Sequence, residues 1–314
     1  MKNFALIGAS GYIAPRHMQA IKKTKNNLVA AYDPYDGIGI IDSYFPDAKF
    51  FVEMERFDRY IDKIRNQKTN KIDYISICSP NYLHDSHIRF SLKSGCDAIC
   101  EKPLVLNPWN LERLMTIEQE SKQNIYSILQ LRLHPSIINL NKYVKAQIKS
   151  NNKKFDVDLT YITSRGNWYF TSWKGNEQKS GGICTNIGIH FFDMLGWIFG
   201  DLQNSYLHYK SSETMAGFIE FQNARVRWYL SVNKNNLPSL AIKSNKTTYR
   251  SIIVDKKEIE FSDGFTDLHT ESYKKILNNQ GFELSDTIAS IKIVSDLRTM
   301  KVSSNSNEKH PFIQ

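Results

Sequence analysis

The alternation of predicted strands and helices over the first 130 residues is the feature that most constrains the fold of this chain. Short apolar runs of strand length alternate with segments that have the spacing of an amphipathic helix. The predicted strands lie at residues 4–8, 27–33, 72–80, 97–104 and 124–132, and the predicted helices lie at 15–23, 87–95 and 107–122. This order is typical of a doubly wound parallel sheet with helices on both faces.

A different pattern begins near His134. One predicted helix is followed by longer segments that alternate apolar and polar residues, and two helices joined at Gly281 close the chain. The alternating segments lie at 155–166, 205–212, 215–232 and 249–262. A period of two predicts an antiparallel or mixed sheet with one face covered. A chain of 314 residues is long enough for two domains. We therefore expect an α/β domain over residues 1–133 and an α+β domain with a large open sheet over 134–314.

A glycine-rich segment, Gly8-Ala-Ser-Gly11-Tyr-Ile-Ala14, follows the first predicted strand. In the usual G-x-G-x-x-G/A turn, the first glycine makes the turn, the second lets the backbone approach a pyrophosphate, and the third small residue lets the helix pack closely. The segment has one extra residue between its first two glycines and can still fill these roles. It predicts a Rossmann-type dinucleotide site at Gly8, Gly11, Tyr12 and Ile13. A glycine turn in a fold without a cofactor is the alternative.

An acidic residue ends the second predicted strand, about 20 residues after the glycine segment. This residue is Asp33, in "VAAYDPYD". A carboxylate at this position accepts hydrogen bonds from the adenosine ribose and repels a 2′-phosphate, and no arginine follows it. The sequence therefore favours NAD over NADP as the cofactor.

The basic residues are too scattered to form a nucleic-acid surface. The formal net charge is +9, but the lysines are spread over separate loops such as "KKTKNN" and "KSNKTTYR". They form no basic helix face, and aromatic residues are not interleaved with them. We expect no nucleic-acid partner.

The expected location is the cytoplasm. No run approaches the roughly 20 apolar residues of a membrane helix, and the N-terminus lacks the pattern of a signal peptide. Cys78, Cys96, Cys100 and Cys184 form no CxxC pair, and most lie in apolar contexts. They are expected to be reduced structural thiols.

Three motifs in order, "SICSPNYLHDSHI", "CEKPL" and "GGICTNIGIHFFDML", resemble the NAD(P)-dependent sugar oxidoreductases typified by glucose-fructose oxidoreductase and inositol dehydrogenase. The resemblance covers nearly the entire chain. Within that family, "SRGNWYFTSWKG", "CEKPLV", "GFTDLHTESY" and the long glycine turn are most similar to the UDP-N-acetylglucosaminuronate 3-dehydrogenases of bacterial surface-polysaccharide synthesis. The resemblance implies a Rossmann domain, and a C-terminal domain whose open sheet covers the active site. That sheet commonly mediates oligomers, so a homotetramer or homodimer is expected.

The resemblance implies two catalytic residues, Lys102 and His190. An ammonium at Lys102, which follows a parallel strand, can hydrogen-bond the reacting hydroxyl and stabilise alkoxide charge. A histidine, with an unperturbed pKa of about 6.5, suits a general base. Asn186 stands where many relatives carry aspartate; an amide cannot relay a proton, so it would orient the substrate or Lys102, and Lys102 stays an alternative base. The competing interpretations are a solvated loop lysine and a core histidine whose ring is fixed by Asp193.

The resemblance also assigns residues to the nicotinamide half of the cofactor site. They are Ser79, Pro80, Asn81 and His84, with Glu101 and Lys102 beside them and Arg132 at the end of the last parallel strand. Two interpretations of Arg132 are equally good. In one it binds a carboxylate or phosphate, and in the other it forms an inter-domain salt bridge.

Three histidines have a spacing that suggests a metal cluster at first sight. They are His84, His87 and His134, but no acidic or cysteine ligand joins them with suitable geometry, and the family needs no metal. We expect no metal and treat His87 and His134 as structural.

A polar, glycine-rich segment between the first strand of the second domain and the helix that carries His190 is the predicted substrate loop. An anionic nucleotide sugar needs cations and aromatic or polar surfaces, and the loop offers Arg165, Asn167, Trp168, Trp173 and Lys174. Packing of the tryptophans in a core is the alternative. With Lys102, Asn186 and His190 these residues make up the predicted substrate set.

The predicted reaction is the NAD-dependent oxidation of the C3 hydroxyl of UDP-N-acetyl-D-glucosaminuronate to a 3-keto sugar nucleotide. In some resembling enzymes 2-oxoglutarate reoxidises the bound NADH, which makes it a candidate partner. Two alternatives are a relative that acts on another sugar or inositol, and a non-catalytic sensor that binds NAD.

Overall fold

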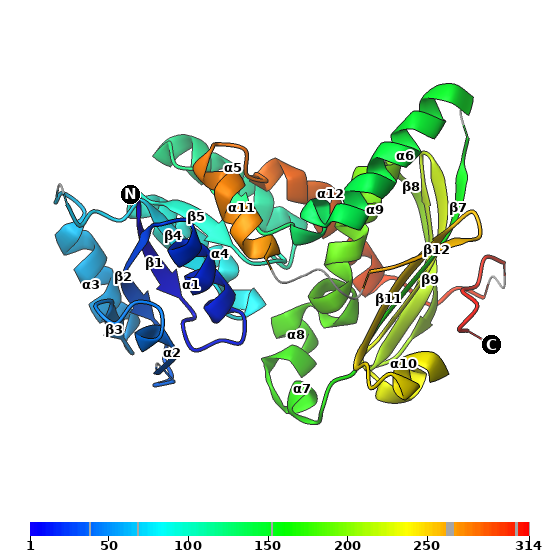
Figure 1. Cartoon of the computed structure of the whole chain (residues 1–314), viewed down its shortest axis with the longest axis horizontal. Helices are drawn as coiled ribbons and strands as arrows, with labels where there is room; N and C mark the ends of the chain where they lie inside the picture. The colour runs from blue at the N-terminus through cyan, green and yellow to red at the C-terminus, as the bar shows by residue number, and fades with distance from the viewer. Residues whose placement is uncertain (38, 68, 152, 262–266, 305–306, 314) are drawn as a thin grey trace. The chain divides into compact units, whose positions relative to one another are not determined.

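The computed structural model describes residues 1–37, 39–67, 69–151, 153–261, 267–304 and 307–313. The chain divides into two compact units (Figure 1). The first unit holds Met1–Gln130 and Thr266–Ile288, and the second holds Leu131–Phe265 and Ala289–Gln314. The segment of the motif "GFTDLHTESY" at 264–266 lies outside the described residues.

The first unit is built on a six-stranded parallel sheet in the order β3-β2-β1-β4-β5-β6, which is the Rossmann order. This confirms the predicted doubly wound sheet. The strands are β1 (Asn3–Ile7), β2 (Asn27–Tyr32), β3 (Lys49–Phe51), β4 (Tyr74–Ile77), β5 (Asp97–Cys100) and β6 (Ile125–Ser127). The helices are α1 (Ala14–Lys23), α2 (Gly39–Asp42), α3 (Met54–Ile64), a 3₁₀ turn (Asn81–Leu83), α4 (His84–Lys93), α5 (Pro108–Ser121) and α11 (Leu268–Leu277).

The core of the first unit lies on both faces of its sheet. On one face, α1 and α11 bury apolar side chains in a cluster that also contains Phe4 and Tyr74. The ring of Phe4 stacks on Tyr74 at 5.0 Å and on Tyr273 of α11 at 5.7 Å between centroids. On the other, Phe57 of α3 packs on Phe90 of α4 at 5.8 Å. Burial on both faces explains why the strands are continuous apolar runs.

The helix α11 belongs to the first unit, although the predicted boundary after residue 133 assigned it to the second domain. The physical reason is packing. Tyr273 is fully buried among residues of the first sheet, and its hydroxyl lies 2.6 Å from Ser76 Oγ on β4. A chain segment that returns late in sequence to an earlier domain leaves no local pattern, so the boundary prediction could not find it.

The second unit is built on a six-stranded mixed sheet in the order β12-β11-β7-β10-β9-β8, which confirms the predicted open mixed sheet. Among the described strands of this second sheet, only the β7–β10 pair is parallel, with Phe155 beside Ala224. The strands are β7 (Phe155–Thr163), β8 (Leu202–Lys210), β9 (Thr214–Phe221), β10 (Ala224–Ser231), β11 (Thr248–Val254) and β12 (Lys257–Glu260). The helices are a 3₁₀ turn (Gln130–Leu133), α6 (Pro135–Asn151), α7 (Trp168–Thr171), a 3₁₀ turn (Trp173–Gly175), α8 (Glu177–Ser180), a π-helical turn (Cys184–Gly188), α9 (Ile189–Phe199), a 3₁₀ turn (Lys234–Asn236), α10 (Ser239–Lys243) and α12 (Leu284–Thr299), which crosses the division between the units.

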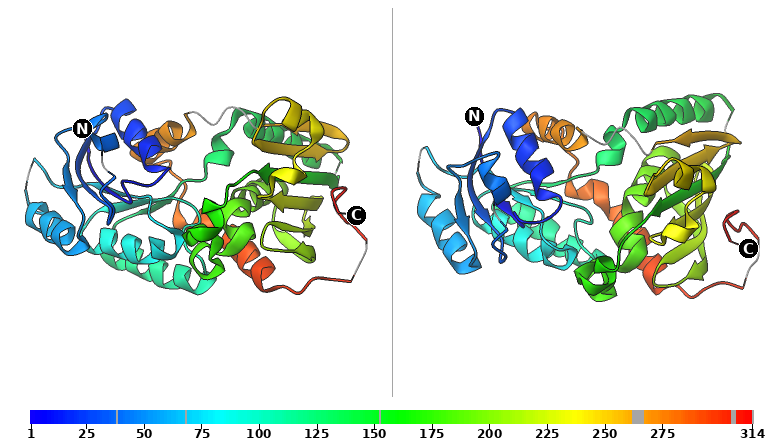
Figure 2. Two further views of the ribbon diagram at one scale, coloured as in Figure 1. Left: turned by 90° about the horizontal axis from the view of Figure 1, so that it is seen from below. Right: turned by 60° about the horizontal axis from the view of Figure 1, so that its bottom comes forward.

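Helices α6 and α9 lie on one face of the second sheet, and the C-terminal residues lie on the other (Figures 1 and 2). On the helical face, Phe192 of α9 meets Trp228 of β10 edge to face at 5.3 Å. On the opposite face, the His310 ring stacks on Tyr229 at 5.5 Å, and its Nε2 lies 3.1 Å from Thr160 Oγ1. The terminal residues therefore cover part of the sheet that would otherwise be exposed.

Two features bear on the expected location. Among the described residues, one helical stretch, 177–199, is long and apolar enough by length and composition to cross a membrane. Of its most apolar 18-residue segment, 72% is buried within the protein, as in the core helix of a globular protein. The four cysteines are buried and free, in agreement with the expectation of structural thiols.

Candidate functional site

The glycine turn between β1 and α1 has the geometry of a dinucleotide-binding turn. Gly8 has φ +86°, and a Cβ there would lie 2.6 Å from the backbone of Cys78 and Ser79, so a side chain is excluded. The N–H of Gly11 donates to the Gly8 carbonyl at 3.1 Å and closes the turn. No side chain caps the N-terminus of α1. Uncapped N–H groups at a helix start suit the pyrophosphate of a dinucleotide, so the turn fits the predicted cofactor.

Asp33 joins this turn to the end of β2. It is 6% exposed, and its carboxylate accepts from the N–H of Ser10 and from the N–H of Tyr35, each at 2.9 Å. A carboxylate has about four acceptor positions, so both oxygens can still accept from ribose hydroxyls. The structure therefore shows a second task for Asp33, which is to fix the shape of the glycine turn.

Replacing Asp33 by asparagine should lower the affinity for NAD by about 10-fold, because hydrogen bonds to a charged acceptor are lost. It should also reduce the preference for NAD over NADP, because the negative charge that repels a 2′-phosphate is removed. Titration calorimetry with both cofactors measures the two effects. Asp36→Asn, at an exposed position three residues on, is the matched control. Tighter binding of NADP than NAD by the unmodified protein would contradict the assignment.

The segment after β4 carries the residues predicted to line the nicotinamide. Ser79 and Asn81 are buried, and His84 begins α4. The His84 ring bridges two loops, with Nδ1 2.6 Å from the Pro103 carbonyl and Nε2 2.9 Å from the Ser79 carbonyl. Both partners are carbonyl oxygens, so the ring donates to both only when it carries two protons. Burial lowers the pKa of His84 and so favours the neutral ring, which donates to one carbonyl at a time. The ring lies between the loop after β4 and the loop after β5 and contacts both.

His87 makes stability depend on pH. Its Nδ1 lies 2.8 Å from Ser79 Oγ, and burial, followed by the nearby His84, lowers its pKa from 6.5 to about 4. Between these values the unfolded chain binds a proton that the folded chain does not, so stability is complete above pH 6.5 and falls as the pH falls. Acidification from about pH 7 to 5 should cost about 2 kcal/mol through His87.

Urea unfolding at several pH values measures this effect in the wild type and in His87→Asn. The variant should lose the part of the slope that His87 supplies. It should keep the part from His310, whose pKa is also lowered to about 4 by burial. Equal slopes in the two proteins would show that His87 does not titrate in this way.

Lys102 is the second residue after β5, at the edge of the sheet where Gly8, Asp33 and the segment after β4 also lie. Carboxyl ends of parallel strands share one edge, and ligands of such sheets bind there. The lysine is half-buried, and its backbone nitrogen lies 3.3 Å from Glu101 Oε2. The first unit therefore brings its predicted cofactor residues and Lys102 together.

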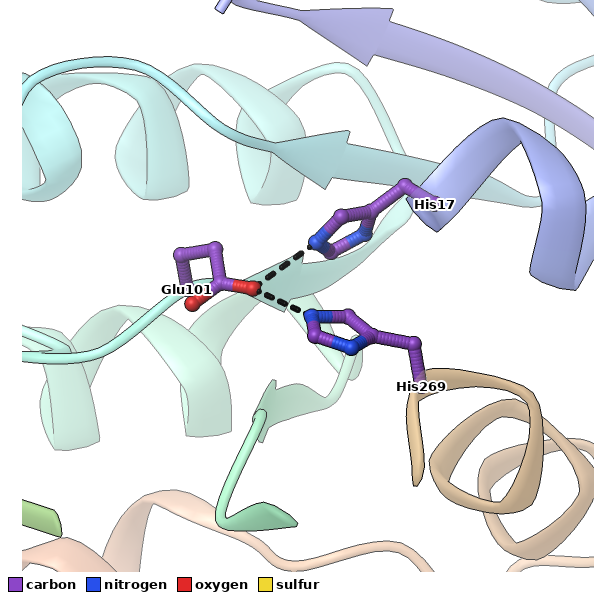
Figure 3. A group of neighbouring side chains, drawn as sticks. All are labelled: His17, Glu101 and His269. Atoms are coloured by element: carbon purple, nitrogen blue, oxygen red, sulfur yellow. Dashed lines mark hydrogen bonds and ion pairs between the residues drawn. The ribbon is translucent and has the colours of Figure 1, made fainter. Parts of the chain in front are cut away.

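Glu101 points into the interior of the first unit, where a cluster of buried polar residues surrounds it. Its Oε1 lies 3.0 Å from Nε2 of His17 on α1 and 2.8 Å from Nε2 of His269 on α11 (Figure 3). Sequence reasoning assigned Glu101 to the cofactor and missed both histidines. That cofactor contact stays a prediction, and the network is what the structure shows for the side chain.

Arg132 and Asp193 form a buried ion pair inside the second unit. The Arg132 guanidinium donates from Nε to Asp193 Oδ2 at 2.9 Å and from Nη2 to Oδ1 at 2.7 Å. Both residues are under 10% exposed. The contact is thus a salt bridge, as one of the two expected interpretations had it, but both residues belong to the second unit, so it is not an inter-domain one. The suggestion that Asp193 also fixes the ring of His190 stays a prediction.

The helix that carries Asn186 and His190 begins with the π-helical turn Cys184–Gly188. Asn186 Nδ2 donates to the hydroxyl of Tyr169 at 2.9 Å. His190 is half-buried in the first turn of α9. A π turn changes the angle between residues four apart, so the directions of these two side chains differ from those in a regular α-helix. Such turns are frequent at functional sites.

The predicted substrate loop forms a cationic and aromatic cluster after β7. The Lys174 ammonium lies 4.9 Å from the ring centre of Trp168 and 5.6 Å from that of Trp173. Burial and the charge of Arg165 lower the pKa of Lys174. Arg165, Asn167 and Trp168 are exposed, so this part of the loop is not core packing. The loop thus offers cations for the anionic groups of a nucleotide and aromatic faces for its rings.

Comparisons with known proteins agree with these observations. Residues 2–128 match the model of an oxidoreductase family with an NAD-binding Rossmann fold, and residues 151–311 match that of the family's C-terminal alpha/beta domain. The chain is 46% identical to the WlbA (WbpB) dehydrogenase from Thermus thermophilus, solved with NAD and alpha-ketoglutarate, with full coverage of both chains and a TM-score of 0.95. A second structure of that dehydrogenase, solved with NAD and UDP-GlcNAcA, gives 45% identity over both full chains and a TM-score of 0.95.

Curated relatives are more distant. The D-glucoside 3-dehydrogenase of Escherichia coli is 22% identical over 184 residues, which are 50% of this chain and 51% of the relative. The first three curated relatives are matched over 16%, 31% and 51% of their own lengths. The two family models together span most of the chain. The protein therefore belongs to the oxidoreductase family that joins an NAD-binding Rossmann domain to a C-terminal alpha/beta domain.

Proposed function

We propose that this protein oxidises the C3 hydroxyl of UDP-N-acetyl-D-glucosaminuronate with NAD, giving the 3-keto sugar nucleotide as a step in surface-polysaccharide synthesis. The observation that carries the proposal is the full-length similarity, at 46% and 45% identity, to a dehydrogenase solved with NAD and with UDP-GlcNAcA. The cationic loop after β7 supports the same class of substrate, because a diphosphate and a carboxylate need cations.

In this proposal the first unit holds the cofactor. The N-terminus of α1 binds the pyrophosphate, Asp33 binds the adenosine ribose, and the segment of Ser79, Asn81 and His84 lines the nicotinamide. Bound NAD supplies the hydride acceptor. Arg132 is not given a direct cofactor contact, because its guanidinium is bound to Asp193.

Two residues carry the proposed chemistry at the sugar. His190 accepts the proton of the C3 hydroxyl, since an imidazole is a suitable base near neutral pH. Lys102, as an ammonium, donates a hydrogen bond to the same oxygen and stabilises the negative charge that develops as the proton leaves, before hydride transfer forms the ketone. Asn186 orients the substrate, and its bond to Tyr169 fixes its amide.

The loop after β7 binds the anionic parts of the substrate in this proposal. Arg165 and Lys174 meet the negative charges, and the tryptophan faces next to Lys174 receive a ring or an acetamido group. 2-Oxoglutarate is the proposed acceptor that returns NADH to NAD, in line with the Thermus structure that contains alpha-ketoglutarate. A homo-oligomer and a cytoplasmic location remain predictions.

A substrate panel tests the proposal. Initial rates of NADH formation at 340 nm are compared for UDP-N-acetylglucosaminuronate, myo-inositol and glucose 6-phosphate, the last two being the kinds of substrate for which curated relatives are named. We expect kcat/KM for the sugar nucleotide to exceed the others by about 100-fold or more, because neither of the others carries the diphosphate and the carboxylate that Arg165 and Lys174 are proposed to bind. An equal or higher value for either of the others would overturn the choice of substrate.

A further inference from the structure

Glu101 is a buried carboxylate with three hydrogen-bond donors around it. His17 and His269 both approach Oε1 through Nε2, at 3.0 and 2.8 Å, and the backbone N–H of Lys102 approaches Oε2 at 3.3 Å. Glu101 is 8% exposed, His17 is fully buried and His269 is 3% exposed. Two donors come from α1 and α11, and the third is the backbone N–H of the residue next to Glu101, so the carboxylate ties both helices to the end of β5 (Figure 3).

The hydrogen bonds of this cluster continue away from Lys102 and can all be satisfied at once. The Tyr273 hydroxyl lies 2.8 Å from His17 Nδ1 and 2.6 Å from Ser76 Oγ. Ser76 can donate to Tyr273, Tyr273 can donate to His17 Nδ1, and each histidine can then donate from Nε2 to Glu101. His17, Glu101 and His269 lie close enough to hold a metal ion, with ligand atoms within 4.8 Å of one another. Because hydrogen bonding accounts for all three ligand atoms, we treat the group as a hydrogen-bonded carboxylate.

The side chain of Glu101 is ionised. Burial acts to raise the pKa of Glu101, but opposing causes, led by the hydrogen bonds from His17 and His269, hold that pKa well below its usual range. Burial lowers the pKa of His17, which is therefore neutral near pH 7. An ionised carboxylate is thus fixed in the interior directly beside the residue proposed to act on the substrate.

We propose that Glu101, held by His17 and His269, is a positioning residue that keeps Lys102 in place at the end of β5 and in its ammonium form. A fixed negative charge favours a neighbouring ammonium over the neutral amine. The inference rests on the proposed role of Lys102 and deepens it, because a lysine kept charged serves as hydrogen-bond donor and leaves the role of base to His190. It also gives α11 a task in the active site of the Rossmann unit.

Other titratable groups near this cluster do not oppose the effect. Burial raises the pKa of Cys78, Cys100 and Tyr273, so all three are neutral. His84, whose pKa burial lowers, lies on the other side of the loop and contacts Pro103. Among the described residues, the titratable groups that act on Glu101 or feel its charge include His17 on α1, Cys78 after β4, His84 on α4, Cys100 on β5, and His269 and Tyr273 on α11.

The first test needs no enzymatic activity. Competitive acetylation of the free protein across pH, read by mass spectrometry of the peptide with Lys102, reports the fraction of neutral amine. In Glu101→Gln, the pH of half-maximal labelling should fall by about one unit, because the favourable charge is lost. Glu118→Gln makes the same change at a half-buried carboxylate that accepts from Ile125 N–H at 2.8 Å, and it should leave the labelling curve unchanged. Superimposable curves for wild type and Glu101→Gln would overturn the inference.

The second test uses turnover. Glu101→Gln should lower kcat by 10-fold or more, while KM for the sugar and Kd for NAD change less than threefold. His269→Gln, which can still donate to Glu101, should keep most of the activity that His269→Leu loses. This pair decides the question if Glu101→Gln does not fold, and equal activity of the two His269 variants would contradict the positioning role. If the wild type does not oxidise the sugar, the proposed function fails, and the labelling curves still decide the inference.

Discussion

Lys102→Met should lower kcat for NAD reduction by about 10²- to 10³-fold, because it removes the donor that stabilises the developing alkoxide. Methionine keeps a long apolar stem, so the loop after β5 should keep its packing. Most of the proposed cofactor contacts are made by the N-terminus of α1, by Asp33 and by the segment after β4, so Kd for NAD should change only a few-fold. Stopped-flow absorbance at 340 nm and calorimetry with NAD measure the two quantities.

The matched control for this loss is Lys93→Met, at an exposed position in the last turn of α4. It removes the same charge from the same unit and should leave kcat within twofold. A variant at Lys102 that keeps full turnover would remove the residue from the chemistry. A variant that loses NAD binding and retains kcat would make Lys102 a cofactor-binding residue.

Breaking the buried Arg132–Asp193 pair should have the largest effect on stability. Its bidentate geometry, at 2.9 and 2.7 Å, satisfies two charges inside the second unit. Asp193→Leu leaves the guanidinium buried without its carboxylate, and such losses cost about 3–5 kcal/mol. Urea unfolding at pH 7 should show this as a lower midpoint.

The double variant Arg132→Met with Asp193→Leu separates the pair from its surroundings. Removing both charges avoids an uncompensated ion, so the double variant should be more stable than Asp193→Leu alone. Glu220→Gln, which breaks the surface pair of Lys154 and Glu220, should cost less than about 1 kcal/mol. Arg132→Met alone completes the comparison. If the losses of unfolding free energy in the two single variants add up to the loss in the double variant, the two charges are not coupled.

Much of the fold follows from the sequence because its signals are local. Apolar runs that end at Gly8, Asp33 and Pro80 give the parallel strands their positions, and period-two alternation gives the second sheet. Strand β3 gave no such signal, since it has three residues and none is fully buried. Helix α3 was also not predicted, although Phe57, Ile61 and Ile64 repeat at helical spacing and could have indicated it.

The partners of the site residues could not be read from the sequence in the same way. His17 and His269 are 252 residues apart, and both contact Glu101 only because α11 returns to the first unit. One signal was available: His269 and Tyr273 are four residues apart in a helix and so share a face. For Arg132, the sequence offered a choice of partners, and Asp193 became its partner through the packing of α9.

The central claim is that this protein moves a hydride from C3 of a UDP-linked uronate to NAD. The most direct test supplies UDP-N-acetylglucosaminuronate with deuterium at C3 to the NAD-loaded protein, without an oxoacid, and analyses the cofactor by mass spectrometry. The account predicts NADH that carries one deuterium, formed up to one equivalent per site, and return to NAD when 2-oxoglutarate is added. NADH without deuterium, or no reduction of bound NAD, would contradict it.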